Sequence, residues 1–302
     1  MDPQHFPARM AQIVKHSLPS PLRSLYWRWL LGTEAFAEQP IRSSARLALW
    51  SFRELRQNDI CFRTKSGVKI CSMPKNLSAL ALYLEGTRDP WMQRFIERRI
   101  GPHETFVDVG ANIGAYSLNV AKHAGVIYAF EAQPKIYKYL LGNIVANSLT
   151  NIQAFNFAIG SGEGSISVQY MADNPGESFV TTHTYRKSTP VAMHSLDGIM
   201  ATIGCDRIDY LKIDVEGFEF NVILGAIKAI ITNSDIVVQT EHVERHARRY
   251  GQSNLVTINY LRAHGLSPYR VNSQGLLKLI TENEFEGDVI WTRALAARPY
   301  LE

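Results

Sequence analysis

From about residue 103 onward, short apolar runs alternate with longer stretches in which apolar residues recur every three or four positions. Short apolar runs are typical of buried parallel strands, and the longer period is that of an amphipathic helix. The alternation predicts an α/β fold built on a mostly parallel sheet. The predicted strands are 106–109, 126–131, 152–157, 208–214 and 235–241, and the predicted helices are 115–122, 134–147, 217–232 and 254–264.

Residues 160–193 interrupt this alternation with a segment rich in glycine, serine and other polar residues. The pattern predicts a hairpin and a loop inserted above the sheet, placed to gate the entry of an acceptor. Its aromatic side chains, Tyr170, Phe179, His183 and Tyr185, could stack on a sugar or aromatic ring, or pack the insertion down. Two closing strands, near 267–271 and 288–292, predict an antiparallel last part of the sheet.

The first hundred residues follow a different pattern, which predicts an N-terminal extension of helices and one hairpin. Residues 1–58 are amphipathic with helical spacing, and two β-prone runs flank Ser66-Gly67 as in a short hairpin. Helices are predicted over 76–85 and 90–99, and Gly101-Pro102 marks the boundary. The predicted domains are therefore 1–100, the extension, and 101–302, the main domain with its insertion.

Within the extension, residues 22–31 mix tryptophan and leucine with arginine. The amphipathic stretch 1–58 could therefore contact a membrane surface or a partner protein. A packing arm whose apolar side chains face the core is the favoured interpretation, and peripheral membrane contact remains the alternative.

Composition narrows the classes of function. The 302 residues are 46% hydrophobic, enough for a sizeable core, and the net charge of +4 does not indicate a nucleic-acid partner. The three cysteines form no C-x-x-C pair, which argues against a disulfide framework or a zinc cluster and predicts buried thiols in a reducing compartment. No secretory signal or membrane-spanning run is found, so a soluble cytoplasmic protein is expected. The oligomeric state is left open.

The most informative stretch lies where the first predicted strand turns into a helix. Asp108 stands near the end of the strand, and two glycines at the turn would let a ligand approach the backbone. The turn would also offer free backbone N–H groups at a helix N-terminus. It departs from the G-x-G-x-x-G pattern of dinucleotide-binding proteins, which disfavours a nicotinamide oxidoreductase. The turn consists of Gly110, Ala111, Asn112, Ile113 and Gly114.

Further acidic residues follow the other predicted strands. Glu131 ends the second strand, where an acid can bind the ribose hydroxyls of a nucleoside cofactor. Asp214 and the pair Glu241-His242 end two later strands. Because the carboxyl ends of parallel strands meet at one edge of a sheet, these groups are expected to lie together. Acids near the turn favour a cofactor with ammonium and sulfonium charges over one with a pyrophosphate.

Four motifs resemble those of the FkbM family of methyltransferases, and the resemblance covers roughly residues 89–292. The motifs are Val107-Asp-Val-Gly-Ala-Asn-Ile-Gly114, Phe130-Glu131, Ser195-Leu-Asp197 and Leu211-Lys-Ile-Asp-Val-Glu-Gly-Phe-Glu219. The resemblance implies the Rossmann-like fold of class I methyltransferases and S-adenosylmethionine as cofactor. It also implies O-methylation of a hydroxyl group on a sugar or natural product. The resemblance also implies a role for each matching residue. Asp108 to Gly114 would line the methionine end of the cofactor, and Glu131 would hold the ribose. Ala158 would lie by the adenine, and Asp214 would face the transferring methyl group.

Methyl transfer to a hydroxyl needs alignment and a base. The candidate bases are Asp214 and the Glu241-His242 pair, and Lys212 could hold Asp214 ionised because it lies on the same face of the strand. A divalent ion held by Asp214, Glu216, Glu241 or His242 ranks below metal-free chemistry. The acceptor is predicted to be a glycan or small-molecule hydroxyl; a secondary-metabolite methyltransferase and a non-catalytic cofactor-binding protein are the alternatives.

Overall fold

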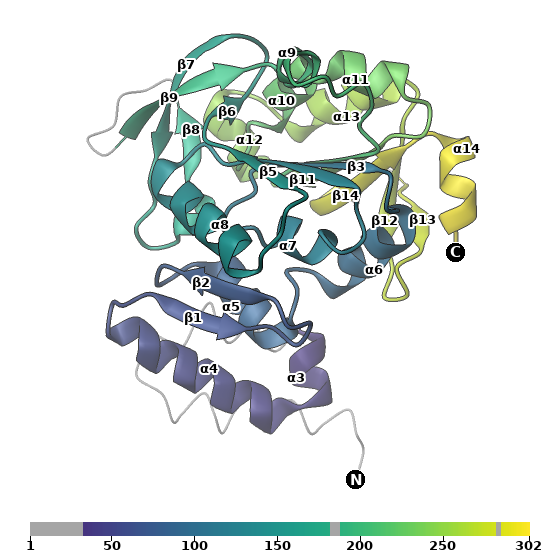
Figure 1. Ribbon diagram of the computed structural model, residues 1–302. Helices are drawn as coiled ribbons and strands as arrows, with labels where there is room; N and C mark the ends of the chain where they lie inside the picture. The colour runs from purple at the N-terminus through teal and green to yellow at the C-terminus, as the bar shows by residue number, and fades with distance from the viewer. Residues whose placement is uncertain (1–32, 182–187, 282–284) are drawn as a thin grey trace.

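A computed structural model describes residues 33–181, 188–281 and 285–302. Its centre is an eight-stranded sheet with the order β13-β12-β14-β11-β10-β3-β4-β5 (Figure 1). The strands β11, β10, β3, β4 and β5 are parallel, whereas β14, β12 and β13 are antiparallel, which confirms the predicted fold class. The strand bounds are β3 Thr105–Val109, β4 Val126–Phe130, β5 Ile152–Phe155, β10 Tyr210–Ile213, β11 Val237–His242, β12 Ser267–Val271, β13 Leu277–Leu279 and β14 Gly287–Thr292.

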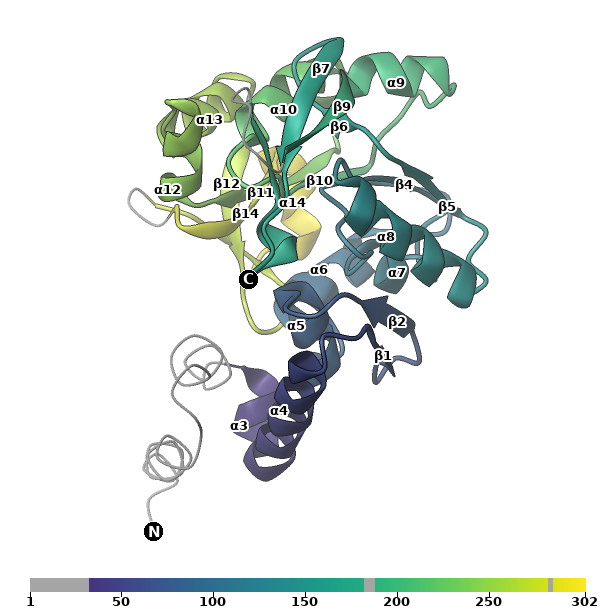
Figure 2. The same cartoon turned by 90° about the vertical axis from the view of Figure 1, so that its left-hand side faces the viewer.

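Helices cover both faces of the sheet, so that the domain has three layers (Figures 1 and 2). The layer drawn below the sheet in Figure 1 holds α5 (Leu77–Glu85), α6 (Pro90–Arg99), α7 (Ser117–Val120) and α8 (Pro134–Ala146). The layer above it holds α9 (Leu196–Thr202), α10 (Glu219–Gly225), α11 (Ile227–Thr232) and α13 (Asn254–Ala263). The short helices α12 (Glu244–Ala247), η3 (Arg248–Tyr250), α14 (Ala294–Ala297) and η4 (Arg298–Tyr300) complete this part.

Side-chain alternation along the central strands builds two separate cores. On β3, Phe106 belongs to the core under α6 and α7, whereas Val107 and Val109 belong to the core under α10 and α13. On β10, Tyr210 stacks on Phe106 with ring centroids 5.0 Å apart, and Leu211 faces the other core. Strands that bury both faces need apolar residues at almost every position, which explains why the sequence revealed them so clearly.

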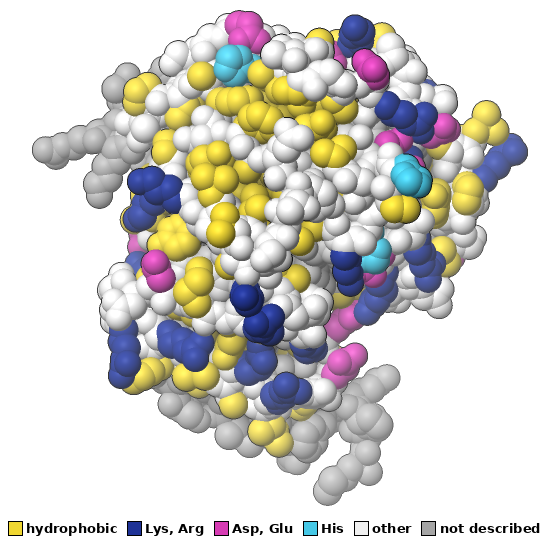
Figure 3. Space-filling view, in the orientation of Figure 1, with side chains coloured by type: hydrophobic (Ala, Val, Ile, Leu, Met, Phe, Trp, Pro, Cys, Tyr) yellow, Lys and Arg dark blue, Asp and Glu magenta, His cyan; other side chains and the backbone are white. Residues whose placement is uncertain are grey.

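The N-terminal extension shares the lower core instead of forming one of its own. It consists of α3 (Glu34–Glu38), α4 (Pro40–Leu55) and the predicted hairpin, β1 (Ile60–Arg63) with β2 (Lys69–Ser72). Trp50 of α4 is fully buried against Phe62 and Tyr83, as expected of a packing arm. Lys and Arg side chains gather over this region in the lower part of Figure 3. The segment 22–31 lies outside the described residues, so peripheral membrane contact stays a prediction. None of the described helices has the length and apolar character needed to cross a membrane.

The prediction of three free thiols is wrong for two of them. Cys61 and Cys71 face one another on β1 and β2 and form a disulfide, and Cys205 is free. Their separation of ten residues fits no common motif, and only the pairing register of the hairpin brings them together.

The insertion is more structured than the predicted hairpin and loop. It forms a four-stranded sheet of β6 (Ala158–Ile159), β9 (Ser188–His194), β7 (Gly164–Gln169) and β8 (Phe179–Thr181), with η2 (Pro175–Glu177) between β7 and β8. Of the predicted stacking residues, Tyr170 contacts Lys135 and Phe179 contacts Arg249. His183 and Tyr185 lie outside the described residues.

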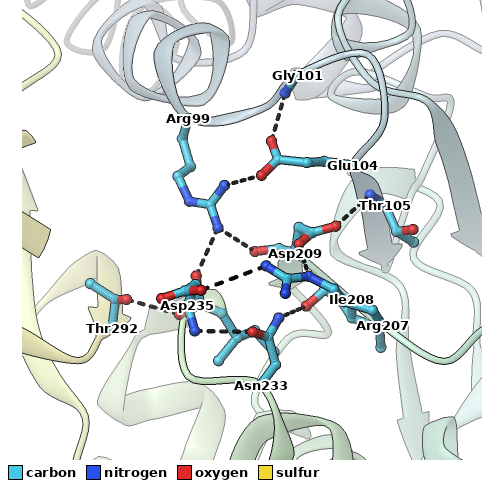
Figure 4. Close-up of polar contacts among 11 residues, drawn as sticks. Arg99, Gly101, Glu104, Thr105, Arg207, Ile208, Asp209, Asn233, Asp235 and Thr292 are labelled. Atoms are coloured by element: carbon cyan, nitrogen blue, oxygen red, sulfur yellow. Dashed lines mark hydrogen bonds and ion pairs between the residues drawn. The ribbon is translucent and has the colours of Figure 1, made fainter. Parts of the chain in front are cut away.

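At the amino ends of the central strands, one buried arginine joins four segments (Figure 4). The guanidinium of Arg99 donates to Glu104 Oε1 at 2.7 Å and to the backbone carbonyl oxygens of Asp235 at 2.7 Å and Asp209 at 3.4 Å. Glu104 in turn accepts from the backbone N–H of Gly101. The network fixes α6 to β10 and β11 at the edge of the sheet opposite the glycine turn.

We expect Arg99→Met to lower the free energy of unfolding by about 2–4 kcal/mol, because it removes the arginine's buried hydrogen bonds to the Asp235 carbonyl and to Glu104 and leaves Glu104 without its charged partner. Urea denaturation measures this change. The matched control is Arg98→Met on the same helix, which is exposed and takes no part in this network, so its loss should cost about 1 kcal/mol or less. Equal losses for the two variants would contradict the structural role of Arg99.

Candidate functional site

A pocket opens at the carboxyl ends of β3, β4, β10 and β11, the place that the parallel topology predicts. Its floor includes Gly110, Ala111 and Asn112 of the glycine turn, and Glu131 and Ala158. Its far wall includes Asp214 and Glu241. Contrary to the prediction, Ile113 and Gly114 do not line it, because Ile113 is buried in the core and Gly114 packs against Leu118 and Leu140. The insertion lines it through Asn174, Glu177 and Val180, and not through Tyr170 or Phe179. The structure therefore brings together most of the predicted site.

The glycine turn fits beneath the pocket because Gly110 has no side chain. Its φ is +81°, and a Cβ there would lie 1.9 Å from the backbone oxygen of Asp214. The close approach places the end of β10 directly beside the turn. The predicted free N–H groups are wrong, however, because Gly110 and Ala111 both donate to the carbonyl oxygen of Phe130. The predicted helix 115–122 is also shorter, with only Ser117–Val120 in α-helical form.

A side-chain hydrogen bond of Asn112 connects the turn to the N-terminal extension. The φ of Asn112 is +53°, a left-handed conformation that asparagine tolerates, and its Oδ1 accepts hydrogen bonds from Asn76 and from the N–H of Ile113. Leu77, Ser78 and Arg88 from the extension also line the pocket. Sequence reasoning missed these residues because it assigned residues 1–100 to a separate extension.

Glu131 lies at the end of β4 with both carboxylate oxygens held in place. One oxygen accepts from the N–H of Asn112 at 2.9 Å and the other from the N–H of Gln133 at 2.8 Å. The side chain is 8% exposed, and burial raises its pKa to about 7 despite those two donors. Each oxygen keeps a lone pair, so the ionised group can accept hydrogen bonds from a diol.

This raised pKa predicts that nucleoside binding weakens in mild acid. A carboxylate must be ionised to accept from two ribose hydroxyls, so a group that titrates near pH 7 has to lose its proton before it binds. The dissociation constant for S-adenosylmethionine should therefore rise about tenfold from pH 8 to pH 6. Calorimetry at several pH values measures it, with Glu131→Gln as the control that binds more weakly and loses the pH dependence. A pH-independent affinity in the unaltered protein would contradict this role.

Asp108 does not face the pocket, contrary to the prediction that it lines the methionine end of a cofactor. It is fully buried and accepts from Ser117 at 2.7 Å and from Lys212 Nζ at 3.1 Å. The register of β3 and β10 pairs Asp108 with Lys212, so both side chains project from the same face of the sheet. Asp108 acts instead as a buried partner of that lysine.

Lys212 connects this buried pair to the pocket. Its Nζ also lies 3.5 Å from Asp214 Oδ2, and it sits over the Tyr116 ring. Burial alone would lower the pKa of Lys212, but the carboxylates of Asp108 and Asp214 outweigh burial and raise it. The lysine is thus charged and orients Asp214, whose side chain is 34% exposed toward the pocket.

Beyond Asp214 the chain makes a second tight turn that brings in a histidine. Glu216 has a φ of +58°, and Gly217, with a φ of +104°, packs so closely on α12 that a Cβ would lie 2.3 Å from the carbonyl oxygen of His246. Glu216 Oε2 consequently lies 3.1 Å from His246 Nδ1, and Glu241 Oε2 lies 3.7 Å from the same nitrogen. Burial, followed by the charges of Asp214 and Glu241, raises the pKa of Glu216 above its usual range.

The predicted pairing of Glu241 with His242 is wrong, because successive residues of a strand point to opposite faces. Glu241 lines the pocket, whereas His242 is 1% exposed, contacts Thr240 at 2.8 Å and packs beside Trp291. Burial lowers the pKa of His242 to about 4. His246 occupies the position near the acids that the sequence analysis gave to His242.

Comparison with known proteins identifies the family. The family model "Methyltransferase FkbM domain" matches residues 108–268, from the glycine turn to β12. The chain belongs to the FkbM methyltransferase family. The methyl donor of such an enzyme is S-adenosylmethionine, so the predicted cofactor is confirmed together with the family.

The curated relatives that the chain matches are distant. The methyltransferase sdnD of Sordaria araneosa is 28% identical over 152 residues, which span 39% of this chain and 59% of sdnD. Methyltransferase 1 of Beauveria bassiana is 24% identical over 147 residues, or 41% of this chain and 59% of that protein. The chain thus matches little more than half the length of these relatives.

The crystal structure of a methyltransferase FkbM from Methylobacillus flagellatus is 13% identical, with a TM-score of 0.46, and the match covers 94% of this chain and 76% of that one. These similarities are too low to identify an acceptor.

Proposed function

We propose that this FkbM-family protein is an S-adenosylmethionine-dependent O-methyltransferase that acts on a hydroxyl group of a sugar or glycan. The observation that supports this proposal most is a single pocket that joins the glycine turn and Glu131 to the acidic groups Asp214 and Glu241. A cofactor laid across the turn would point its sulfonium methyl group at side chains that can accept a proton. A neutral, polyhydroxylated acceptor suits an acidic wall, whereas an anionic acceptor would be repelled.

Each part of the pocket has a role in this proposal. The backbone from Gly110 to Asn112 supports the methionine end, Glu131 accepts from the ribose hydroxyls, and Ala158 lies against the adenine. The positive charge of Arg88 suits the methionine carboxylate. Asp214, oriented by Lys212, faces the methyl group and the acceptor.

The reaction is one in-line displacement. The acceptor oxygen forms a bond to the methyl carbon while the carbon–sulfur bond breaks and its electron pair stays on sulfur. The proton of the acceptor hydroxyl passes to Asp214 or Glu241, and S-adenosylhomocysteine leaves as a neutral thioether. The protein contributes alignment and a proton acceptor, the two things this displacement needs.

Transfer from radiolabelled S-adenosylmethionine to a panel of sugars, glycans and small hydroxylated metabolites tests the proposal. We expect label on a hydroxyl acceptor and none on its deoxy analogue. Label found only on small metabolites would favour the secondary-metabolite alternative, and cofactor binding without any transfer across the panel would favour a non-catalytic binding protein.

A further inference from the structure

Three side chains from separate segments converge at the acceptor end of the pocket. Glu216 comes from the turn after β10, Glu241 from β11 and His246 from α12, and their nearest ligand atoms all lie within 4.8 Å of one another. Their side chains are 12%, 23% and 7% exposed, respectively. This is a partly buried set of two carboxylates and one imidazole.

Two buried polar atoms of this set have no hydrogen-bond partner, which indicates a ligand. Glu216 Oε2 and His246 Nδ1 are both buried and form no hydrogen bond, although they lie only 3.1 Å apart. Unsatisfied buried polar atoms are rare and call for an explanation such as an ion or a bound group. His246 is 6% exposed, so its Nδ1 has no access to bulk solvent and is directed at the two carboxylates.

The distances suit a divalent cation. Ligand atoms about 2.1 Å from a shared ion lie about 3 to 3.5 Å from one another in octahedral or tetrahedral geometry. The separations of 3.1 Å and 3.7 Å from His246 Nδ1 are close to that range. The ligand atoms of Glu216 and Glu241 lie within 4.8 Å of one another. A mixed oxygen and nitrogen set is compatible with Mn²⁺ and Zn²⁺.

We propose that Glu216, Glu241 and His246 bind one divalent metal ion beside Asp214. Three protein ligands leave coordination positions open toward the pocket. Resting on the proposed function, we infer that the acceptor hydroxyl would occupy one of these positions. With Glu241 acting as a ligand, the proton of that hydroxyl would pass to Asp214, and the ion would stabilise the alkoxide that forms. The sequence favoured a metal-free reaction over one that uses a bound divalent ion, and the proposed site reverses that preference.

Metal binding has one structural requirement. Arg245 Nε donates to His246 Nε2 at 3.1 Å, whereas an imidazole that binds a metal through Nδ1 carries its proton on Nε2. The arginine must therefore turn away when the ion binds. Its side chain is exposed on α12, so this movement displaces no core residue.

Titration of the full-length, chelator-treated protein with Mn²⁺, followed by electron paramagnetic resonance, tests the site without any acceptor or methyl donor. We expect one tight site, and at least a tenfold weaker affinity in each of Glu216→Gln, Glu241→Gln and His246→Gln. Glu244→Gln is the matched control, since it removes a carboxylate from the same helix as His246 and should bind Mn²⁺ like the unaltered protein.

Absence of a tight site, or equal affinity in the three variants and the control, would overturn the metal site. Either result would leave the methyl-transfer proposal intact, because that proposal is judged by label transfer. Conversely, a specific Mn²⁺ site in a protein that transfers no label would support the site and reject its role with the acceptor.

Discussion

Asp214→Asn should reduce kcat by about 10² to 10⁴-fold, the range expected when a positioned proton acceptor is lost. The amide has nearly the same shape, so the hydrogen bond from the Asp214 N–H to the Val109 carbonyl and the close contact with Gly110 should persist. Lys212 would keep its bond to Asp108 but lose its second carboxylate. Steady-state methyl transfer, with circular dichroism as a check on folding, measures the effect.

The matched control for this substitution lies near the other end of the same strand. Asp206 is exposed and remote from the pocket, so Asp206→Asn should leave kcat unchanged. Full turnover in Asp214→Asn would remove Asp214 from the mechanism.

Gly110→Ala should abolish measurable binding of S-adenosylmethionine and lower the melting temperature markedly. The added Cβ would meet the Asp214 backbone oxygen at 1.9 Å, a contact that only a shift of β3 or β10 can relieve. A positive φ adds strain of about 1 kcal/mol for alanine. Thermal unfolding with and without the cofactor reports both effects.

Gly204→Ala separates the strain from the collision. Gly204 has a φ of +71°, but a Cβ added there would meet no atom within 4 Å, so alanine should cost about 1 kcal/mol and leave cofactor binding intact. If Gly110→Ala bound the cofactor as well as Gly204→Ala does, the close approach of the turn to β10 would have no functional meaning.

The sheet and its carboxyl-end site could be predicted from the sequence because buried parallel strands and glycine turns leave strong local patterns. Phe106, Val107 and Val109 indicate a strand buried on both faces, and Gly110 indicates a close approach of the backbone. The acids Glu131, Asp214 and Glu241 then follow by topology, since each ends a parallel strand.

Features that depend on packing between distant segments could not be predicted in this way. Asp108 and Lys212 are far apart in the sequence. Only the register of β3 and β10 shows that Asp108 forms a buried ion pair with Lys212 instead of contacting a cofactor. His246 reaches the site because Gly217 packs on α12, whereas strand alternation turns the adjacent candidate, His242, away. The Cys61–Cys71 disulfide likewise depends on the hairpin register.

The central claim is that the methyl donor lies across the glycine turn with its sulfur toward Asp214. A crystal structure of the protein with S-adenosylhomocysteine tests this most directly. We predict that the ribose hydroxyls bind Glu131, that the adenine lies beside Ala158, and that the sulfur atom faces Asp214. A ligand bound elsewhere on the protein, or a ribose placed away from Glu131, would contradict the account.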